Sequence, residues 1–186
     1  MSQTFAGCDL GKTSISFAVF QLRGDDPPAL LRSGCVPHGG QPFATFEQLY
    51  RDEELGACAA LGATGTYSGQ LARPAVALPE DVCLAAALDW TPGVPDTVTL
   101  MSVGGRGYRV LVRRPSGPGA AEPWEISYLE NDKCSSGTGE NLLKIAGRFG
   151  LCPAEADALA LGADGTLPIT APCSVFAQRE MPPHAT

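Results

Sequence analysis

The pattern of hydrophobic and polar positions predicts one unit twice along the chain: a strand, a tight glycine turn, a second strand, a third strand and a helix. In the first half, the predicted elements are strands over Phe5–Asp9, Ser14–Leu22 and Ala29–Val36 and a helix over Phe43–Ala57. In the second half, they are strands over Thr97–Val103, Tyr108–Arg114 and Glu125–Glu130 and a helix over Gly137–Phe149. This repetition predicts two α/β lobes of similar topology.

Two further elements and a break in the chain separate the halves. A short strand is predicted over Ala59–Ala63 and a helix over Pro79–Asp89. The segment Trp90–Pro95 holds two prolines and a glycine, which favour a connection over a regular element. We therefore expect a first lobe over residues 1–95 and a second lobe over residues 96–186.

The two glycine turns, Gly11–Thr13 and Gly104–Gly107, are candidate phosphate-binding loops. A tight turn without bulky side chains allows backbone N–H groups to point at phosphate oxygens. Taken alone, either turn is only an ordinary hairpin. Two such turns facing each other across a cleft would bind a triphosphate from both sides.

Charge and composition exclude several classes of protein. The net charge of −7 argues against a surface for nucleic acid or anionic membrane. No apolar run approaches the roughly 18 residues of a membrane helix, and Met1–Phe5 lacks the features of a signal peptide. Seven scattered cysteines make a poor disulfide framework and predict a reducing, cytoplasmic location.

Two of the cysteines, Cys134 and Cys173, lie where an extended segment is predicted to give way to a helix. The partial positive charge of a helix N-terminus favours a thiolate, and it also suits a metal–sulfur cluster or a phosphate. Because the chain has no C-x-x-C pair, spacing alone favours two buried structural cysteines.

The strings around these cysteines resemble one family. Asn131-Asp132-Lys133-Cys134-Ser135-Ser136-Gly137-Thr138-Gly139 and Cys173-Ser174-Val175-Phe176-Ala177 are similar to motifs of the activators of 2-hydroxyacyl-CoA dehydratases and the ATPase subunits of benzoyl-CoA reductase. The resemblance extends from about Ala6 to Glu180. It implies an actin-like, sugar-kinase-like ATPase fold with duplicated ribonuclease-H-like lobes.

The resemblance also implies cofactors and partners. Cys134 and Cys173 of each protomer would ligate one [4Fe–4S] cluster held between two subunits, which makes the protein a homodimer. ATP and Mg²⁺ would bind between the lobes, with Asp9 holding Mg²⁺ through water and Thr13 bonding a phosphate oxygen. The partner would be a CoA-ester dehydratase or reductase component. The nucleotide-binding residues implied are Asp9, Gly11, Lys12, Thr13, Gly104, Gly105 and Arg106.

This chain departs from the family pattern at the second turn. The family has acidic residues on both sides of the glycines and a glutamine after them, whereas this chain has Ser102, Arg106 and Gly107 at these places. Arginine does not act as a base at neutral pH. Lys12 is a further added cation. The two cations would favour nucleotide binding while hydrolysis is slow. Because both acids are absent and the sequence ends before the family's adenosine-binding motif, we expect weak nucleotide binding at best and very slow hydrolysis.

Other departures concern the middle and the end of the chain. Leu84 follows Cys83 where the family has a histidine, so we interpret Cys83 as structural, like Cys8, Cys35, Cys58 and Cys152. We expect both histidines, His38 and His184, to be solvated, and the sequence shows no zinc site. The sequence also ends before the family's adenosine-binding motif, which predicts a truncated second lobe.

The best interpretation is an ATP-dependent iron–sulfur activator that passes a low-potential electron to a CoA-ester dehydratase or reductase. A degenerate relative that binds a cluster or a partner without hydrolysing ATP is one alternative. A phosphotransferase resembling sugar or acetate kinases is another, although it needs a carboxylate base. A structural interaction module with inert cysteines is the third.

Overall fold

The computed structural model describes residues 2–24, 26–73, 75–105, 107–131, 139–166 and 168 of the 186-residue chain. It divides the chain into two units. The first comprises Met1–Ser102 and Arg109–Leu129, and the second comprises Val103–Tyr108 and Glu130–Thr186. Each unit is described by itself, and the lobe boundary expected between residues 95 and 96 stays a prediction.

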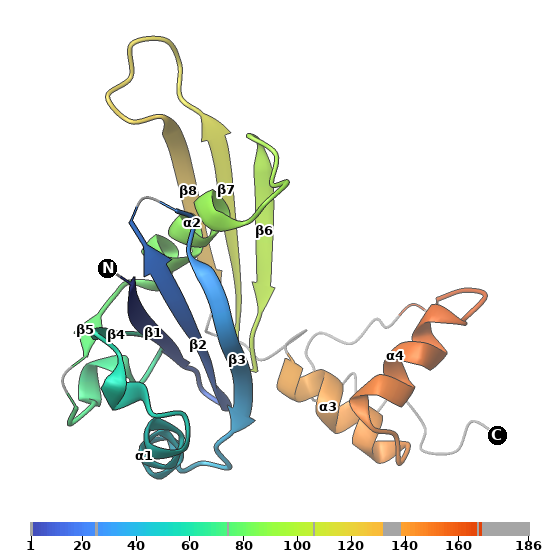
Figure 1. The fold of residues 1–186 in the computed structure, drawn as a ribbon. Helices are drawn as coiled ribbons and strands as arrows, with labels where there is room; N and C mark the ends of the chain where they lie inside the picture. The colour runs from blue at the N-terminus through green and yellow to red at the C-terminus, as the bar shows by residue number, and fades with distance from the viewer. Residues whose placement is uncertain are drawn as a thin grey trace. The chain divides into compact units, whose positions relative to one another are not determined.

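A five-stranded mixed sheet with the order β3-β2-β1-β4-β5 forms the centre of the first unit (Figure 1). Its strands are β1 (Ser2–Leu10), β2 (Ser14–Arg23), β3 (Ala29–Pro37), β4 (Ala60–Thr64) and β5 (Val76–Ala77). The first three are antiparallel neighbours, and β4 runs parallel to β1 and β5. The strands predicted in the first half of the chain are thus confirmed, whereas the two-residue β5 was not predicted.

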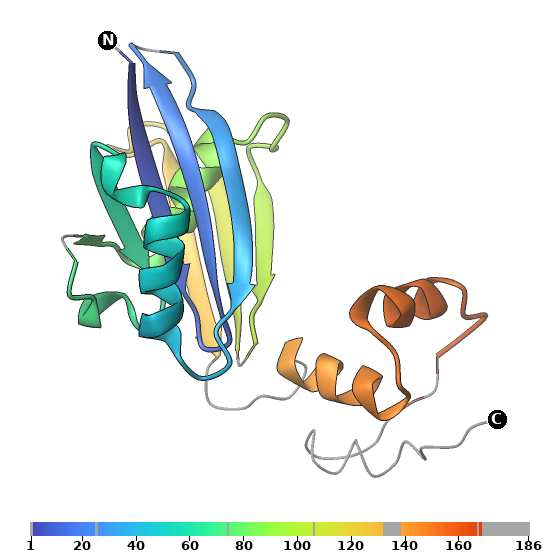
Figure 2. The same cartoon turned by 60° about the horizontal axis from the view of Figure 1, so that its bottom comes forward.

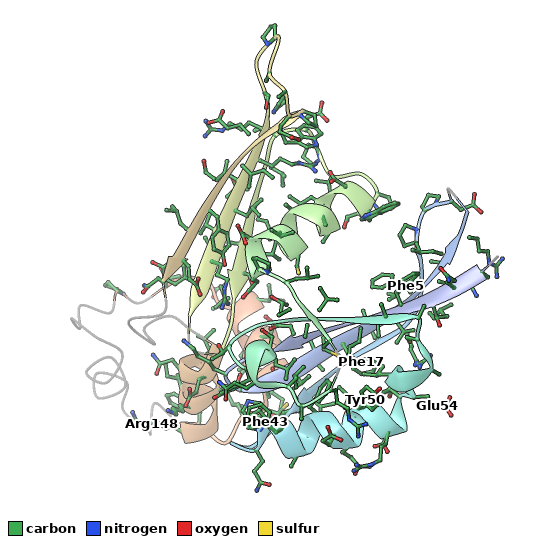
Figure 3. The ribbon with its side chains drawn as sticks, turned by 90° about the vertical axis from the view of Figure 1, so that its left-hand side faces the viewer. Phe5, Phe17, Phe43, Tyr50, Glu54 and Arg148 are labelled. Atoms are coloured by element: carbon green, nitrogen blue, oxygen red, sulfur yellow. The ribbon has the colours of Figure 1, made fainter. Side chains whose placement is uncertain are left out.

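Helix α1 (Pro42–Asp52) lies along one face of this sheet (Figure 2). Alternate residues of the strands face it, and Leu10 and Ile15 are fully buried in the shared core. Phe46 lies 1% exposed in the same core, and Figure 3 shows Phe43 and Tyr50 on the same helix. Proline is tolerated in a first helical turn, so Pro42 is compatible with this start.

The predicted end of this helix at Ala57 was wrong. The helix stops at Asp52, and a 3₁₀ turn follows over Leu55–Ala57. Glu54 between them has φ of 49°, a left-handed conformation that cannot continue a right-handed helix. A second 3₁₀ turn occupies Ser68–Gln70.

Helix α2 (Glu80–Trp90) packs against the three-stranded sheet β6-β7-β8. The strands are β6 (Val98–Val103), β7 (Tyr108–Pro115) and β8 (Trp124–Asn131), close to the predicted bounds. Two ion pairs join the helix to β7, Arg109–Glu80 and Arg113–Asp89.

Two helices belong to the second unit, α3 (Gly139–Arg148) and α4 (Pro153–Leu161), shown in orange in Figure 1. The helix predicted over Gly137–Phe149 corresponds to α3. Helix α4 was not predicted, because its alanine-rich sequence lacks one apolar stripe. In the parts of the chain that the structure describes, no helix is long and apolar enough to cross a membrane.

Candidate functional site

Asp9 lies at the end of β1, on the face of the first sheet that points away from α1. Its neighbours Cys8 and Leu10 are buried in the core on the α1 side, so the alternation of the strand directs Asp9 to the opposite face. There it lines a cavity of about 580 Å³. Phe5, labelled in Figure 3, lines the same cavity. The other lining residues are mostly small or apolar, and Asp9 is the one carboxylate among them.

The end of β4 completes the surroundings of Asp9. Thr64 is the parallel partner of Asp9 across the sheet and lines the same cavity. Its hydroxyl oxygen is buried and lies beside the Cys83 thiol. Gly65 follows with φ of +87°, and a Cβ there would overlap Oδ1 of Asp9. The backbone of Gly65 therefore lies directly against the carboxylate, and no side chain fits between them.

The charges around this site come from three elements. Burial raises the pKa of Asp9, and the nearby positive charge of Arg109 opposes this shift. Arg109 on β7 is ion-paired to Glu80 on α2, with 2.9 Å between Nε and Oε2. Burial also raises the pKa of the Cys83 thiol, against the effect of the neighbouring Thr64 hydroxyl. A partly desolvated carboxylate of this kind gains most from a bound cation.

The first glycine turn, between β1 and β2, is held by His38. The Gly11 N–H donates to the Ser14 carbonyl at 3.0 Å, which closes the turn that carries Lys12 and Thr13. The His38 backbone N–H donates to the Thr13 carbonyl at 3.2 Å. Its ring Nε2 lies 3.2 Å from the Gly11 carbonyl.

The expectation of a solvated His38 was wrong, because the side chain is only 6% exposed. Its Nδ1 accepts the Gly40 N–H at 3.1 Å, so Nε2 carries the proton and donates to the Gly11 carbonyl. The sequence was misleading because the glycines after His38, at positive φ, belong to a turn that folds back onto the ring. The ring and the backbone of His38 therefore hold the candidate phosphate turn at the carbonyls of Gly11 and Thr13.

The second glycine turn belongs to the second unit and is joined to α3. The Gly104 N–H donates to the Gly107 carbonyl at 2.8 Å. The first amides of α3, those of Gly139 and Glu140, donate to the carbonyls of Gly104 and Gly105 at 2.9 and 3.0 Å. This turn thus accepts hydrogen bonds from the helix that follows Cys134 in the sequence.

Three of the predicted site residues, Arg106, Cys134 and Cys173, lie outside the described residues, as does His184. Strand β8 ends at Asn131 and α3 begins at Gly139, on either side of Cys134 in the sequence. The cluster ligands therefore stay predictions. Of the five described cysteines, all free, Cys8 is buried as expected and Cys35 and Cys152 are exposed. Within the described ranges, no group of three or more His, Cys, Asp or Glu residues is arranged to hold a metal ion.

The sequence analysis did not single out four residues described above: Thr64 and Gly65 next to Asp9, and the ion pair Glu80 and Arg109. Thr64 and Gly65 could have been found, because a hydroxyl residue and a glycine directly after a predicted buried strand indicate a turn at the strand end. The other two come together only when α2 packs on β7, which no local pattern reveals.

No known family model matches the sequence. A curated relative, the 2-hydroxyisocaproyl-CoA dehydratase activator of Clostridioides difficile, is 29% identical over 91 residues, which are 49% of this chain and 32% of the relative. The solved structure of the activator of the 2-hydroxyisocaproyl-CoA dehydratase from Clostridium difficile with bound ADPNP has a TM-score of 0.72 and 23% identity. That match covers 95% of this chain and 63% of the solved one.

Component A of the (R)-2-hydroxyglutaryl-CoA dehydratase of Acidaminococcus fermentans is similar too, with a TM-score of 0.71 and 21% identity. That match covers 96% of this chain and 66% of the other. The chain thus spans about two thirds of these solved structures. The resemblance to the dehydratase activators is confirmed, and the fold is that of these actin-like ATPases.

Proposed function

We propose that this chain is a nucleotide-responsive activator that carries an iron–sulfur cluster and passes a low-potential electron to a CoA-ester dehydratase or reductase in the cytoplasm. Cys134 and Cys173 would each supply one thiolate per protomer, and two protomers would hold one [4Fe–4S] cluster between them. The similar proteins are activators of CoA dehydratases, which supports this role.

The surroundings of the Asp9 carboxylate are the main support for nucleotide binding. Its carboxylate is partly desolvated directly before the closed glycine turn, and the buried Thr64 hydroxyl lies beside it in the same cavity. A hydrated Mg²⁺ ion and a phosphate oxygen would satisfy both groups. The activator with the TM-score of 0.72 binds ADPNP, which supports a nucleotide at this site.

Within such a site, the residues have separate tasks. Asp9 would orient the metal-bound water, while Lys12 and the Thr13 hydroxyl would bind phosphate oxygens. His38 would keep the turn rigid, because its ring and backbone hold both ends of the turn. Rigid donors bind an anion at a lower entropic cost than mobile ones.

The second turn would connect the nucleotide with the cluster. The amides of Gly139 and Glu140 donate to the carbonyls of Gly104 and Gly105, so a shift of this turn would also shift the start of α3. The cluster, when bound, would supply one-electron chemistry. Small movements at its ligands matter, since about 59 mV changes a one-electron equilibrium tenfold.

A degenerate, non-hydrolysing relative is the second candidate. Ser102 and Gly107 stand where the resembling family has acids, so the residues that would organise metal and attacking water are missing. A phosphotransferase is less favoured, because Glu80 at the start of α2 is held in an ion pair with Arg109. An ion-paired carboxylate is a poor general base.

Anaerobic reconstitution with iron and sulfide tests the proposal. We expect the unaltered chain to bind iron with a visible absorption band, and Cys134→Ser and Cys173→Ser to lose both. Cys58→Ser and Cys152→Ser, which change other free cysteines, should keep them. Unchanged iron content in Cys134→Ser would contradict the ligand assignment.

A further inference from the structure

The cavity beside Asp9 is lined by three rows of residues that run across the central strands of the first sheet. The strand register places one row at each of three successive positions of β1 that face away from α1, those of Phe5, Gly7 and Asp9. These three residues are half-buried, whereas Ala6 and Cys8 between them are buried in the core on the α1 side. The helix thus closes one face of the sheet, and the other face carries the cavity of about 580 Å³.

The middle row forms the floor of the cavity. Gly7 pairs with Ala18 of β2 and with Gly62 of β4, and all three residues line the cavity. A Cβ on Gly7 would meet no atom within 4 Å. The floor therefore leaves room for a ligand, while the rows on either side of it determine which ligand fits.

The row on one side of the floor is apolar. Phe5, on the face away from α1 (Figure 3), pairs with Phe20 of β2 and with Ala60 of β4, and all three line the cavity. Leu78 adds a further apolar wall, because its Cδ1 lies 3.4 Å from the position that a Cβ on Gly62 would take. This end of the cavity fits an aromatic or aliphatic group.

The row on the other side of the floor is polar. Asp9 pairs with Ser16 of β2 and with Thr64 of β4, and these residues also line the cavity. Among the described residues that line it, Asp9 is the only charged one, so no Lys, Arg or His side chain occupies this end. A carboxylate next to an apolar wall favours a positively charged group, because the cation replaces contacts with water that burial removes.

We propose that this cavity binds a small molecule with an apolar body and a primary ammonium group at one end. The ammonium group has three N–H donors, which suit the Asp9 carboxylate and the neighbouring Ser16 hydroxyl. The apolar body lies over the floor toward Phe5. The rows of Phe5 and Asp9 are four residues apart, about 13 Å along an extended strand, which limits the length of the ligand.

This inference goes beyond the proposed function, because it needs neither a nucleotide nor the cluster. Asp9 is also the proposed contact of hydrated Mg²⁺, so an amine in the cavity and Mg-ATP exclude each other. A bound amine therefore opposes the nucleotide response.

Isothermal titration calorimetry on the full chain, without nucleotide and Mg²⁺, tests the charge and the shape of the ligand. The probe is 4-phenylbutylamine. Its neutral analogue 4-phenylbutan-1-ol lacks the ammonium group, and butylamine lacks the ring. We expect both comparison compounds to bind about tenfold or more weakly than the probe, because each lacks one of the two contacts.

Two variants connect the binding with the cavity. Asp9→Asn keeps the shape of the side chain and removes its charge, so the amine and the alcohol should bind this variant with affinities within about twofold of each other. Gly7→Val fills the floor and should weaken the binding of both phenyl compounds by about tenfold or more. The matched control is Gly117→Val, which has open space around it and lies outside the cavity. It should leave the affinities within about twofold of those of the unaltered chain.

The outcomes decide the proposal without reference to nucleotide or iron. Equal affinities of the unaltered chain for the amine and the alcohol would overturn it, and so would an undiminished preference for the amine in Asp9→Asn. The second result covers the case in which Gly7→Val fails to fold. Undiminished binding by a folded Gly7→Val, or no binding of the amine by the unaltered chain, would overturn it as well.

Discussion

Asp9 is the residue where stability and function oppose each other most clearly. Its carboxyl pKa is raised by burial, so the folded chain holds the proton more tightly than the unfolded chain. The protonated Asp9 carboxyl therefore adds to the free energy of unfolding at pH values below its ordinary pKa of 3.8. This contribution is lost as the pH rises through the raised pKa of the folded chain. At neutral pH, the fold keeps an ionised carboxylate at a cost.

Asp9→Asn should therefore raise the free energy of unfolding at neutral pH and lose that advantage below about pH 3.8. The same variant should weaken Mg-ATP binding by about tenfold or more, because the amide is a poor partner for hydrated Mg²⁺. Urea unfolding at several pH values and calorimetry measure the two effects. Lower stability of the variant at neutral pH would contradict this account of Asp9.

His38 is the residue that fixes the first glycine turn. His38→Leu would leave the Gly11 carbonyl and the Gly40 N–H without their ring partners in a nearly buried place. We expect a loss of about 1–3 kcal/mol in unfolding free energy, together with weaker nucleotide binding. A thermal melt and a Mg-ATP titration of the same sample check both. An unchanged melting temperature would show that the ring contacts contribute little.

Among the elements, α1 packs on the first sheet through buried side chains, of which Phe46 is the largest. Phe46 is 1% exposed in the core, so Phe46→Ala should cost about 3–5 kcal/mol. Phe43, one turn earlier, is 40% exposed, and Phe43→Ala should cost about 1 kcal/mol. Urea unfolding of both variants measures the difference. Similar losses in both would contradict the helix orientation described here.

Helix α3 depends on a close approach to the second glycine turn. A Cβ on Gly139 would lie 3.3 Å from the Gly104 carbonyl oxygen, in the path of the hydrogen bonds that join them. Gly139→Ala should therefore speed amide hydrogen exchange at Glu140. Gly147→Ala, on the same helix with open space around it, should instead stabilise the helix by about 0.5–1 kcal/mol. Exchange at Glu140 that stays slow in Gly139→Ala would contradict the close approach of α3 to the turn.

The elements also show how far sequence reasoning reaches. Strands and turns near Asp9 were predicted because alternation and glycine position are local signals. The predicted end of α1 was wrong because Glu54 adopts a left-handed conformation, which a glutamate in the sequence does not indicate. The sequence pointed to Asp9 but not to its neighbour Thr64, because the sheet register that pairs the two residues is a property of the whole fold.

For the whole molecule, the fold and the cluster rest on different observations. The fold of the actin-like activators and the Asp9 setting are properties of the described chain. The shared cluster is inferred from two motifs that lie largely outside the described residues. Two thiolates per chain cannot complete a four-cysteine cluster, so the proposal ties the cofactor to a symmetric dimer.

Anaerobic sedimentation with iron analysis of the reconstituted protein tests this central claim most directly. We predict that the loaded protein sediments as a dimer with four iron atoms per pair of chains, and that chelation of the iron shifts it toward monomer, because ligand binding stabilises the assembled state. A loaded protein that remains monomeric with four iron atoms in each chain would contradict the shared cluster, and so would a protein that retains no iron.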